Sequence, residues 1–101
     1  MILGPTLLAL VALAAPAGGP GPGAASAIAA RICTQAQHDL GAASFKRALH
    51  SEAACEATTA PRAQAAVASC LAKSPPGTDG WRRCIDGQVA AAAKALEARH
   101  R

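Results

Sequence analysis

The sequence contains very few aromatic residues. Its 101 residues include no tyrosine, one phenylalanine and one tryptophan, against 29 alanines, so the hydrophobic fraction of 51 % consists largely of methyl groups. A β-sheet favours β-branched and aromatic side chains, whereas alanine has the highest helix propensity. The composition therefore predicts an all-α fold, and at about 100 to 200 residues per domain the chain holds one small domain.

Residues 1–27 contain no acidic, basic or cysteine residue. Within them an apolar run from Thr6 to Ala17 has the length of the apolar region of a secretory signal. It is too short to cross a bilayer, which takes about 20 residues. The glycine- and proline-rich stretch at 18–23 cannot hold a helix, because glycine is entropically costly there and proline lacks a backbone donor. This segment is typical of an export signal rather than of a packed fold.

Three A-x-A motifs are available for cleavage, at 12–14, 15–17 and 25–27, and we prefer the last. We predict a signal peptide and leader over residues 1–27 and a small helical domain over residues 28–101. We expect the domain to be secreted or periplasmic, without a stable membrane anchor.

Large apolar side chains are scarce in the predicted domain. It has 11 of them: Ile28, Ile32, Leu40, Phe45, Leu49, Val67, Leu71, Trp81, Ile85, Val89 and Leu96. So few residues give a weak core, and a short exported chain gains stability from disulfides, each worth about 2 to 4 kcal/mol. We therefore predict that the four cysteines, Cys33, Cys55, Cys70 and Cys84, form two structural disulfides.

The spacing of apolar residues and turn signals predicts a bundle of four helices, or of three long helices and one short. The expected helices are a short one capped by Ser26, a second from about Leu40 to Thr58 capped by Asp39, a third starting at Pro61, and a fourth from about Gly80 to Arg99. A strong turn signal at 74–80 separates the last two. The expected buried positions are Ala63, Val67, Cys70, Leu71 and Ser74 on the third helix, and Trp81, Cys84, Ile85, Val89, Ala92 and Leu96 on the fourth.

The heights of the cysteines along such a bundle leave two pairings open. The nested pairing, Cys33 with Cys84 and Cys55 with Cys70, requires axial offsets of about 4 and 8 Å. The sequential pairing, Cys33 with Cys55 and Cys70 with Cys84, separates its first pair by more than about 10 Å if the second helix is continuous. We favour nesting, and a break in the second helix near Ser51 would rescue the sequential pairing.

The cysteine and histidine spacings do not indicate redox or metal chemistry. No C-x-x-C pair occurs, and no cysteine has the close neighbour that a zinc site needs. The three histidines, His38, His50 and His100, are too far apart in sequence to share one ion from adjacent turns. We expect no cofactor and no bound metal.

Two charged groups remain as candidates. Glu52 and Glu56 lie one helical turn apart, where with His50 they could form an acid/base pair or a weak cation site. Like charges at this spacing also repel, and we favour a hydrated helix face as the explanation. Arg82 and Arg83 are spaced to reach Asp86 and to brace the start of the last helix. No serine lies in the strand-to-helix turn that exposes a nucleophile.

The chain carries a formal net charge of +4 with a pI near 9.2. Its ten basic residues are spread over all the expected helices and are not interleaved with stacking aromatics, which argues against nucleic-acid binding. The Ala91–Ala98 stretch lacks the large apolar side chains of a membrane-lytic helix, which leaves only weak membrane activity open. The four-cysteine layout also departs from twin C-x9-C hairpins and from six-cysteine saposin-like bundles.

The absence of a catalytic set favours a non-enzymatic function. We expect an exported helical protein that binds a partner protein or a small apolar ligand between its helices. The alternatives are a small metal-binding or hydrolytic protein that uses His50, Glu52 and Glu56, and a weakly membrane-active cationic protein.

Overall fold

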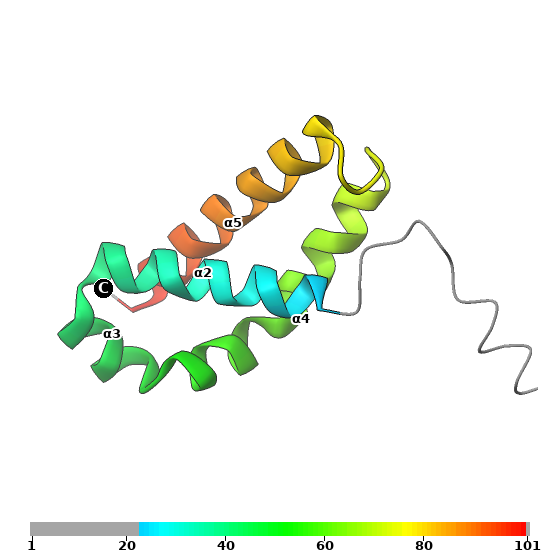
Figure 1. Cartoon of the computed structure of the whole chain (residues 1–101). Helices are drawn as coiled ribbons and strands as arrows, with labels where there is room; N and C mark the ends of the chain where they lie inside the picture. Colours follow the sequence, from blue (N-terminus) through cyan, green and yellow to red (C-terminus); the bar gives the residue numbers. More distant parts are fainter. Residues whose placement is uncertain (1–22, 101) are drawn as a thin grey trace, which may run out of the picture.

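The computed structural model describes residues 23–100, which form four α-helices and no strand. These are α2 (Ala24–Leu40), α3 (Ala42–Leu49), α4 (Glu52–Leu71) and α5 (Asp79–Arg99), shown in Figure 1. The prediction of an all-α bundle with three long helices and one short helix is confirmed, but the short helix is α3 and not, as was expected, the first helix. Residues 1–22 of the predicted leader lie outside the described residues, and positions 24–27 form the first turn of α2.

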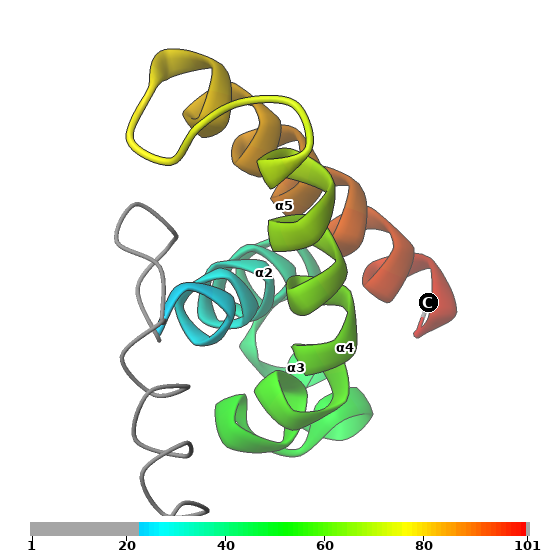
Figure 2. The same cartoon turned by 90° about the vertical axis from the view of Figure 1, so that its right-hand side faces the viewer.

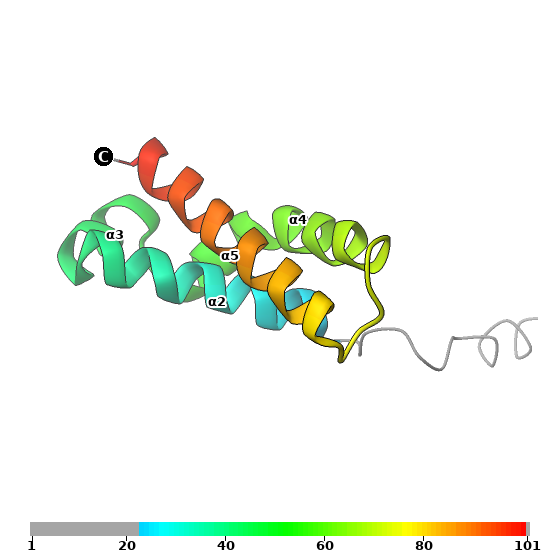
Figure 3. The same ribbon diagram turned by 90° about the horizontal axis from the view of Figure 1, so that it is seen from above.

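Helix α2 is the centre of the arrangement. Both α4 and α5 pack against it, and the contact between α2 and α4 is the most extensive in the molecule. Figure 1 shows α2 between α5 and α4, and Figure 3 shows α5 crossing over α2. Helices α4 and α5 form an antiparallel hairpin whose loop projects away from α2, as Figure 2 also shows. The short α3 joins the end of α2 to the start of α4.

Small side chains allow the helices to approach one another closely. The buried apolar residues are Ile28, Ala29, Ile32, Cys33, Ala36, Phe45, Leu49, Cys55, Ala63, Ala66, Cys70, Ile85, Val89, Ala92, Ala93 and Leu96. Six of these are alanines, so the alanine-rich composition contributes directly to the core as well as to helix propensity. The single phenylalanine, Phe45, and Leu49 lie one turn apart on α3 and are both buried, as their spacing predicted.

The first two helix boundaries differ from the expected ones. Helix α2 begins after Gly23 and includes Ser26, and Asp39 lies in its last turn instead of capping the next helix. The break falls at Gly41, whose φ of +86° is in the left-handed region that glycine adopts without steric cost. Gly41 therefore marks the boundary between α2 and α3.

The next boundary falls at His50 and Ser51, where a continuous helix to Thr58 was expected. His50 has a φ of 71°, which interrupts the helix, and the Ser51 side chain accepts a hydrogen bond from the Ala54 backbone N–H at 3.1 Å. This is a serine N-cap, which satisfies one of the free donors of the first turn of α4. Pro61, the expected start of a helix, lies inside α4.

Helix α4 bends partway along its length (Figure 1). Proline lacks the N–H that would bond one turn back, and its ring crowds the carbonyl there, so Pro61 accounts for the bend. The helix does not end, because Thr59 and Ala63 on either side are both buried in the core. Only the second half of α4 continues into the projecting hairpin.

The turn between α4 and α5 lies where the sequence predicted it. The Thr78 hydroxyl accepts from the Trp81 N–H at 3.2 Å and donates to the Pro75 carbonyl at 2.7 Å, so it caps α5. Of the expected buried positions here, Ile85 is buried, Trp81 is half-buried and Leu71 is exposed. The stripe predicted for the third helix is therefore wrong at Leu71.

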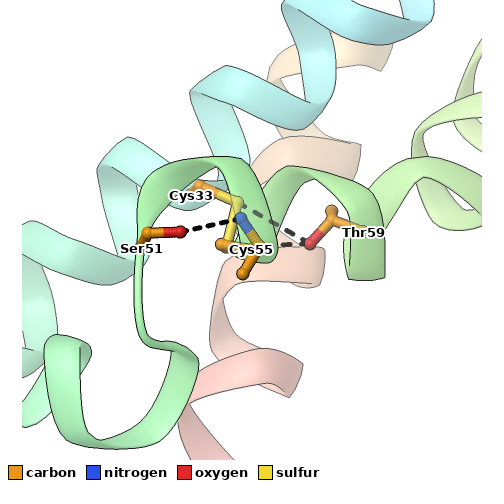
Figure 4. The surroundings of a disulfide bond; sticks show 5 residues. Cys33, Ser51, Cys55 and Thr59 are labelled. Atoms are coloured by element: carbon orange, nitrogen blue, oxygen red, sulfur yellow. Dashed lines mark hydrogen bonds between the residues drawn. A yellow bond between two sulfur atoms is a disulfide. The ribbon is translucent and has the colours of Figure 1, made fainter.

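The nested disulfide pairing is wrong. Cys33 is bonded to Cys55 and Cys70 to Cys84, with Cα–Cα distances of 6.0 and 5.7 Å. The physical reason is the break at 50–51: the chain turns back after α3, so the first turns of α4 lie level with Cys33 (Figure 4). All four predicted disulfide cysteines are paired, and the two bonds indicate an oxidising compartment.

Candidate functional site

A small pocket lies where α2, α4 and α5 meet. We call it the Thr59 pocket; it has a volume of about 90 Å³ and is lined by Ile32, Thr58, Thr59, Arg62, Ala92, Ala95, Leu96 and Arg99. Its apolar lining comes from α2 and α5, and its polar lining comes from α4 and from the end of α5. A mainly apolar hollow with a few polar groups is the general character of a small-molecule site.

Thr59 connects this pocket to the first disulfide. It is buried, and its hydroxyl lies 3.7 Å from the Cys33 sulfur and 3.9 Å from the Cys55 sulfur (Figure 4). Disulfide sulfurs carry no proton, so the hydroxyl donates to one of them at a time. The disulfide thus satisfies a buried polar group and fixes one wall of the pocket.

Two arginines also line the pocket. Arg62 is one turn after Thr58 on α4, and Arg99 is one turn after Ala95 at the end of α5. Both are exposed, and within residues 23–100 neither has a hydrogen-bond or ion-pair partner. No acidic side chain lines the pocket. The Thr59 pocket therefore combines an apolar interior with two uncompensated positive charges.

Two larger hollows lie open on the surface. One, of about 450 Å³, is lined by Leu40, Ser44, Arg47, Ala48 and His100, and the other, of about 330 Å³, by Ala30, Arg31, Thr34, Gln35 and Val89. Their volumes exceed that of the Thr59 pocket because they are shallow and open to solvent. They enclose less of a ligand, so we place the candidate site at the Thr59 pocket.

Asp39, in the last turn of α2, accepts several hydrogen bonds. Gln35 donates to both carboxylate oxygens of Asp39 at 3.0 Å, and His38 Nδ1 lies 3.3 Å from one of them. The hydrogen bond from Gln35 holds the pKa of Asp39 below its ordinary value of 3.8, with smaller contributions from His38 and Glu97.

The residues singled out in the sequence do not assemble into a site. His50 lies in the break before α4, Glu52 lies in the first turn of α4, and Glu56 follows one turn later. Among residues 23–100 no group of three or more His, Cys, Asp or Glu side chains is placed to hold a metal ion. Over the same range, no helix has both the length and the hydropathy that crossing a bilayer requires.

Arg82 and Asp86 each have a partner other than the predicted one. Arg82 pairs with Asp79 on the first turn of α5, and Asp86 pairs at 2.7 Å with Arg31 of α2. The prediction that Arg82 pairs with Asp86 is therefore wrong, because its partner is Asp79. One of the two ion pairs instead links α5 to the central helix.

The sequence held partial signals for the groups that were missed. Thr59 lies four residues from both Cys55 and Ala63, on the buried stripe of α4, but the neighbouring Pro61 indicated a helix end. Glu97 lies one turn after the buried Ala93 on α5. A polar residue at an apolar position of the helical repeat was the available signal in both cases.

Comparison with known proteins gave no match to a family model, to a curated protein or to a solved structure.

Proposed function

We propose that this chain is an exported, non-enzymatic helical protein that binds a small apolar ligand in the Thr59 pocket. The observation that carries the proposal is the pocket itself, where three helices leave a hollow faced by Ile32, Ala92 and Leu96. The side chains of Ala92 and Ala95 are too short to fill this position. Binding of an apolar ligand to a preformed apolar pocket is favourable, because the ligand displaces water from apolar surface.

The surroundings of the pocket favour binding at a low entropic cost. The Cys33–Cys55 bond lies against Thr59, and it ties α2 to α4 directly behind the pocket. A wall that is already rigid loses little conformational freedom when a ligand binds.

Filling the pocket tests this proposal. The disulfide-bonded chain is titrated with neutral and charged probes that carry a four-carbon apolar group, and backbone amide shifts are followed by NMR. We expect shifts at pocket residues in the natural chain and their loss in Ala95→Leu, because leucine occupies the space of the ligand. Ala91→Leu, on the exposed side of α5, is the matched control and should bind as the natural chain does. Equal binding by both variants would rule out this pocket.

Export is tested separately by following the leader. We expect the chain, expressed with residues 1–27 in a secreting host, to leave the cytoplasm and to lose its leader. Cleavage after Ala27 would remove the first turn of α2, whereas cleavage after Ala17 would keep the whole helix. N-terminal sequencing distinguishes the two sites, and a full-length chain retained in the cytoplasm would contradict export.

A second candidate is binding of a partner protein at the hairpin between α4 and α5. Leu71 is 41 % exposed and is the exposed large apolar residue among the described ones, and Val67 and Trp81 nearby are half-buried. A pull-down from the exported fraction should then recover a partner that Leu71→Ser loses and Lys73→Ser retains. Repeated recovery of an isolated monomer would contradict this candidate.

A further inference from the structure

Two positively charged side chains line the Thr59 pocket. Arg62 comes from the middle of α4 and Arg99 from the last turn of α5, yet both line the same hollow of about 90 Å³. Elsewhere, Arg31 and Arg82 each pair with an aspartate. Two like charges around one small hollow repel each other, and the repulsion falls when an anion lies between them. The charge pattern therefore selects for a negatively charged group.

The rest of the lining selects against a simple inorganic anion. Ile32, Ala92 and Leu96 present only hydrocarbon, so an inorganic ion such as phosphate could bond the arginines but would leave the apolar part of the pocket unfilled. A guanidinium group matches a carboxylate through two parallel N–H···O bonds. The chemistry of the pocket thus fits a molecule with a carboxylate at one end and an apolar group at the other.

The volume limits the size of that molecule. At about 30 Å³ per water, the pocket holds about three waters, or roughly four or five heavy atoms of a ligand. Ordinary sites for larger ligands enclose about 300 to 1,000 Å³. A short branched or cyclic apolar group fills the hollow, with the charged end at its rim.

We infer that the Thr59 pocket takes a small organic acid, with its carboxylate between Arg62 and Arg99 and its apolar end against Ile32 and Leu96. This inference rests on the proposed binding function and adds the chemical class of the ligand. So few buried atoms give a dissociation constant of the order of 1 mM.

Matched probes separate the charged end from the apolar end. The disulfide-bonded chain is titrated by NMR with 3-methylbutanoate, with the isosteric neutral 3-methylbutanamide, and with acetate, which lacks the apolar group. We expect 3-methylbutanoate to shift the amides around the pocket, with each of the other two binding at least about tenfold more weakly. Added salt should weaken 3-methylbutanoate binding and leave the amide unchanged, because it screens the exposed arginines.

Arginine variants place the carboxylate. Arg62→Gln and Arg99→Gln should each weaken 3-methylbutanoate binding about five- to tenfold and should not change binding of the amide. Arg83→Gln removes the same charge from an exposed position of α5 outside the pocket, and it should change binding less than twofold. Circular dichroism of each variant confirms that the helices remain.

The outcomes distinguish this inference from the function on which it rests. Equal binding of the acid and the amide overturns the organic acid and leaves apolar binding in the pocket standing. Acetate binding as tightly as 3-methylbutanoate, or an equal loss of affinity in Arg83→Gln, also overturns the inference, because the apolar group or the pocket arginines would then contribute nothing. If none of the probes, including neutral ones, shifts pocket amides, both the inference and the proposed function fail.

Discussion

The two disulfides hold regions of very different packing. We call residues 67–88 the arm, which contains the end of α4, the loop and the start of α5, and we call residues 23–66 with 89–100 the core end. In the arm only Cys70 and Ile85 are buried, whereas most of the buried residues belong to the core end. The Cys33–Cys55 bond therefore lies within a packed core. In the arm, where few side chains are buried, the Cys70–Cys84 bond holds the ends of α4 and α5 together.

This difference shows how a chain with few large side chains divides its stability. Side chains from all four helices converge on the core end, and there alanine lets the helices approach closely. The arm is a two-helix hairpin beyond the end of that contact, and two helices alone bury little surface. The same kind of bond is thus expected to have a global effect in one region and a local effect in the other.

Reducing both disulfides should give the largest effect. Two bonds at about 2 to 4 kcal/mol each are comparable with the whole net stability of an ordinary domain, about 5 to 15 kcal/mol. We expect helical circular dichroism to be lost, or the melting midpoint to fall by more than about 15 °C at about 4 to 8 °C per kcal/mol. Thermal melts with and without reductant measure this. Coincident melts would show that the helices pack well enough alone.

Removing the disulfides one at a time should separate the two regions. The sequence separations of 22 and 14 residues give nearly equal loop entropies, about 3 kcal/mol each, so any difference arises from the surroundings. We expect Cys33→Ala with Cys55→Ala to cost about 3 to 5 kcal/mol of global stability, because both side chains are fully buried.

The corresponding change in the arm should have a smaller global effect. We expect Cys70→Ala with Cys84→Ala to cost about 1 to 3 kcal/mol globally, with faster amide exchange confined to residues 67–88. Hydrogen exchange on both double variants makes the comparison. If the arm variant loses protection throughout the core end, the two regions unfold as one unit.

Truncating one apolar side chain in each region should sharpen the contrast. Ile32→Ala should destabilise the protein by about 2 to 5 kcal/mol, because Ile32 is only 1 % exposed and its truncation leaves a cavity in the core. Leu71→Ala, at 41 % exposure, should change stability by less than about 0.5 kcal/mol. Urea denaturation measures both. Similar costs for the two variants would mean that the arm is covered in solution.

The smallest effect concerns pH and belongs to the core end. Because the pKa of Asp39 is lowered in the folded chain, its ionised form stabilises the fold above the ordinary value of 3.8, and this contribution is lost as pH falls through the lower folded value. We expect Asp39→Asn to be less stable than the natural chain near neutral pH. The difference should disappear once the pH falls below the folded-state pKa of Asp39. Thermal melts across pH measure it, and a difference that stays constant into acid would contradict the role of Asp39.

Composition and helical spacing determined the secondary structure and part of the core. Alanine content and the near absence of aromatic residues were sufficient for an all-α fold, because helix propensity acts locally. The turn at 74–80 and the pairing of Phe45 with Leu49 followed from local signals as well. That all four cysteines are paired followed from chain length and from the small number of large apolar residues.

Tertiary structure alone decided the disulfide partners, the missed helix boundaries and the pocket. Pro61 is a local signal for a helix end, but buried side chains on both sides keep α4 continuous through it. The break at His50 instead returns the chain toward α2, which brings Cys55 to Cys33. Arg62 and Arg99 are 37 positions apart, and only the packing of α4 and α5 against α2 places them around one hollow. Such contacts depend on how helices pack, which local propensity does not encode.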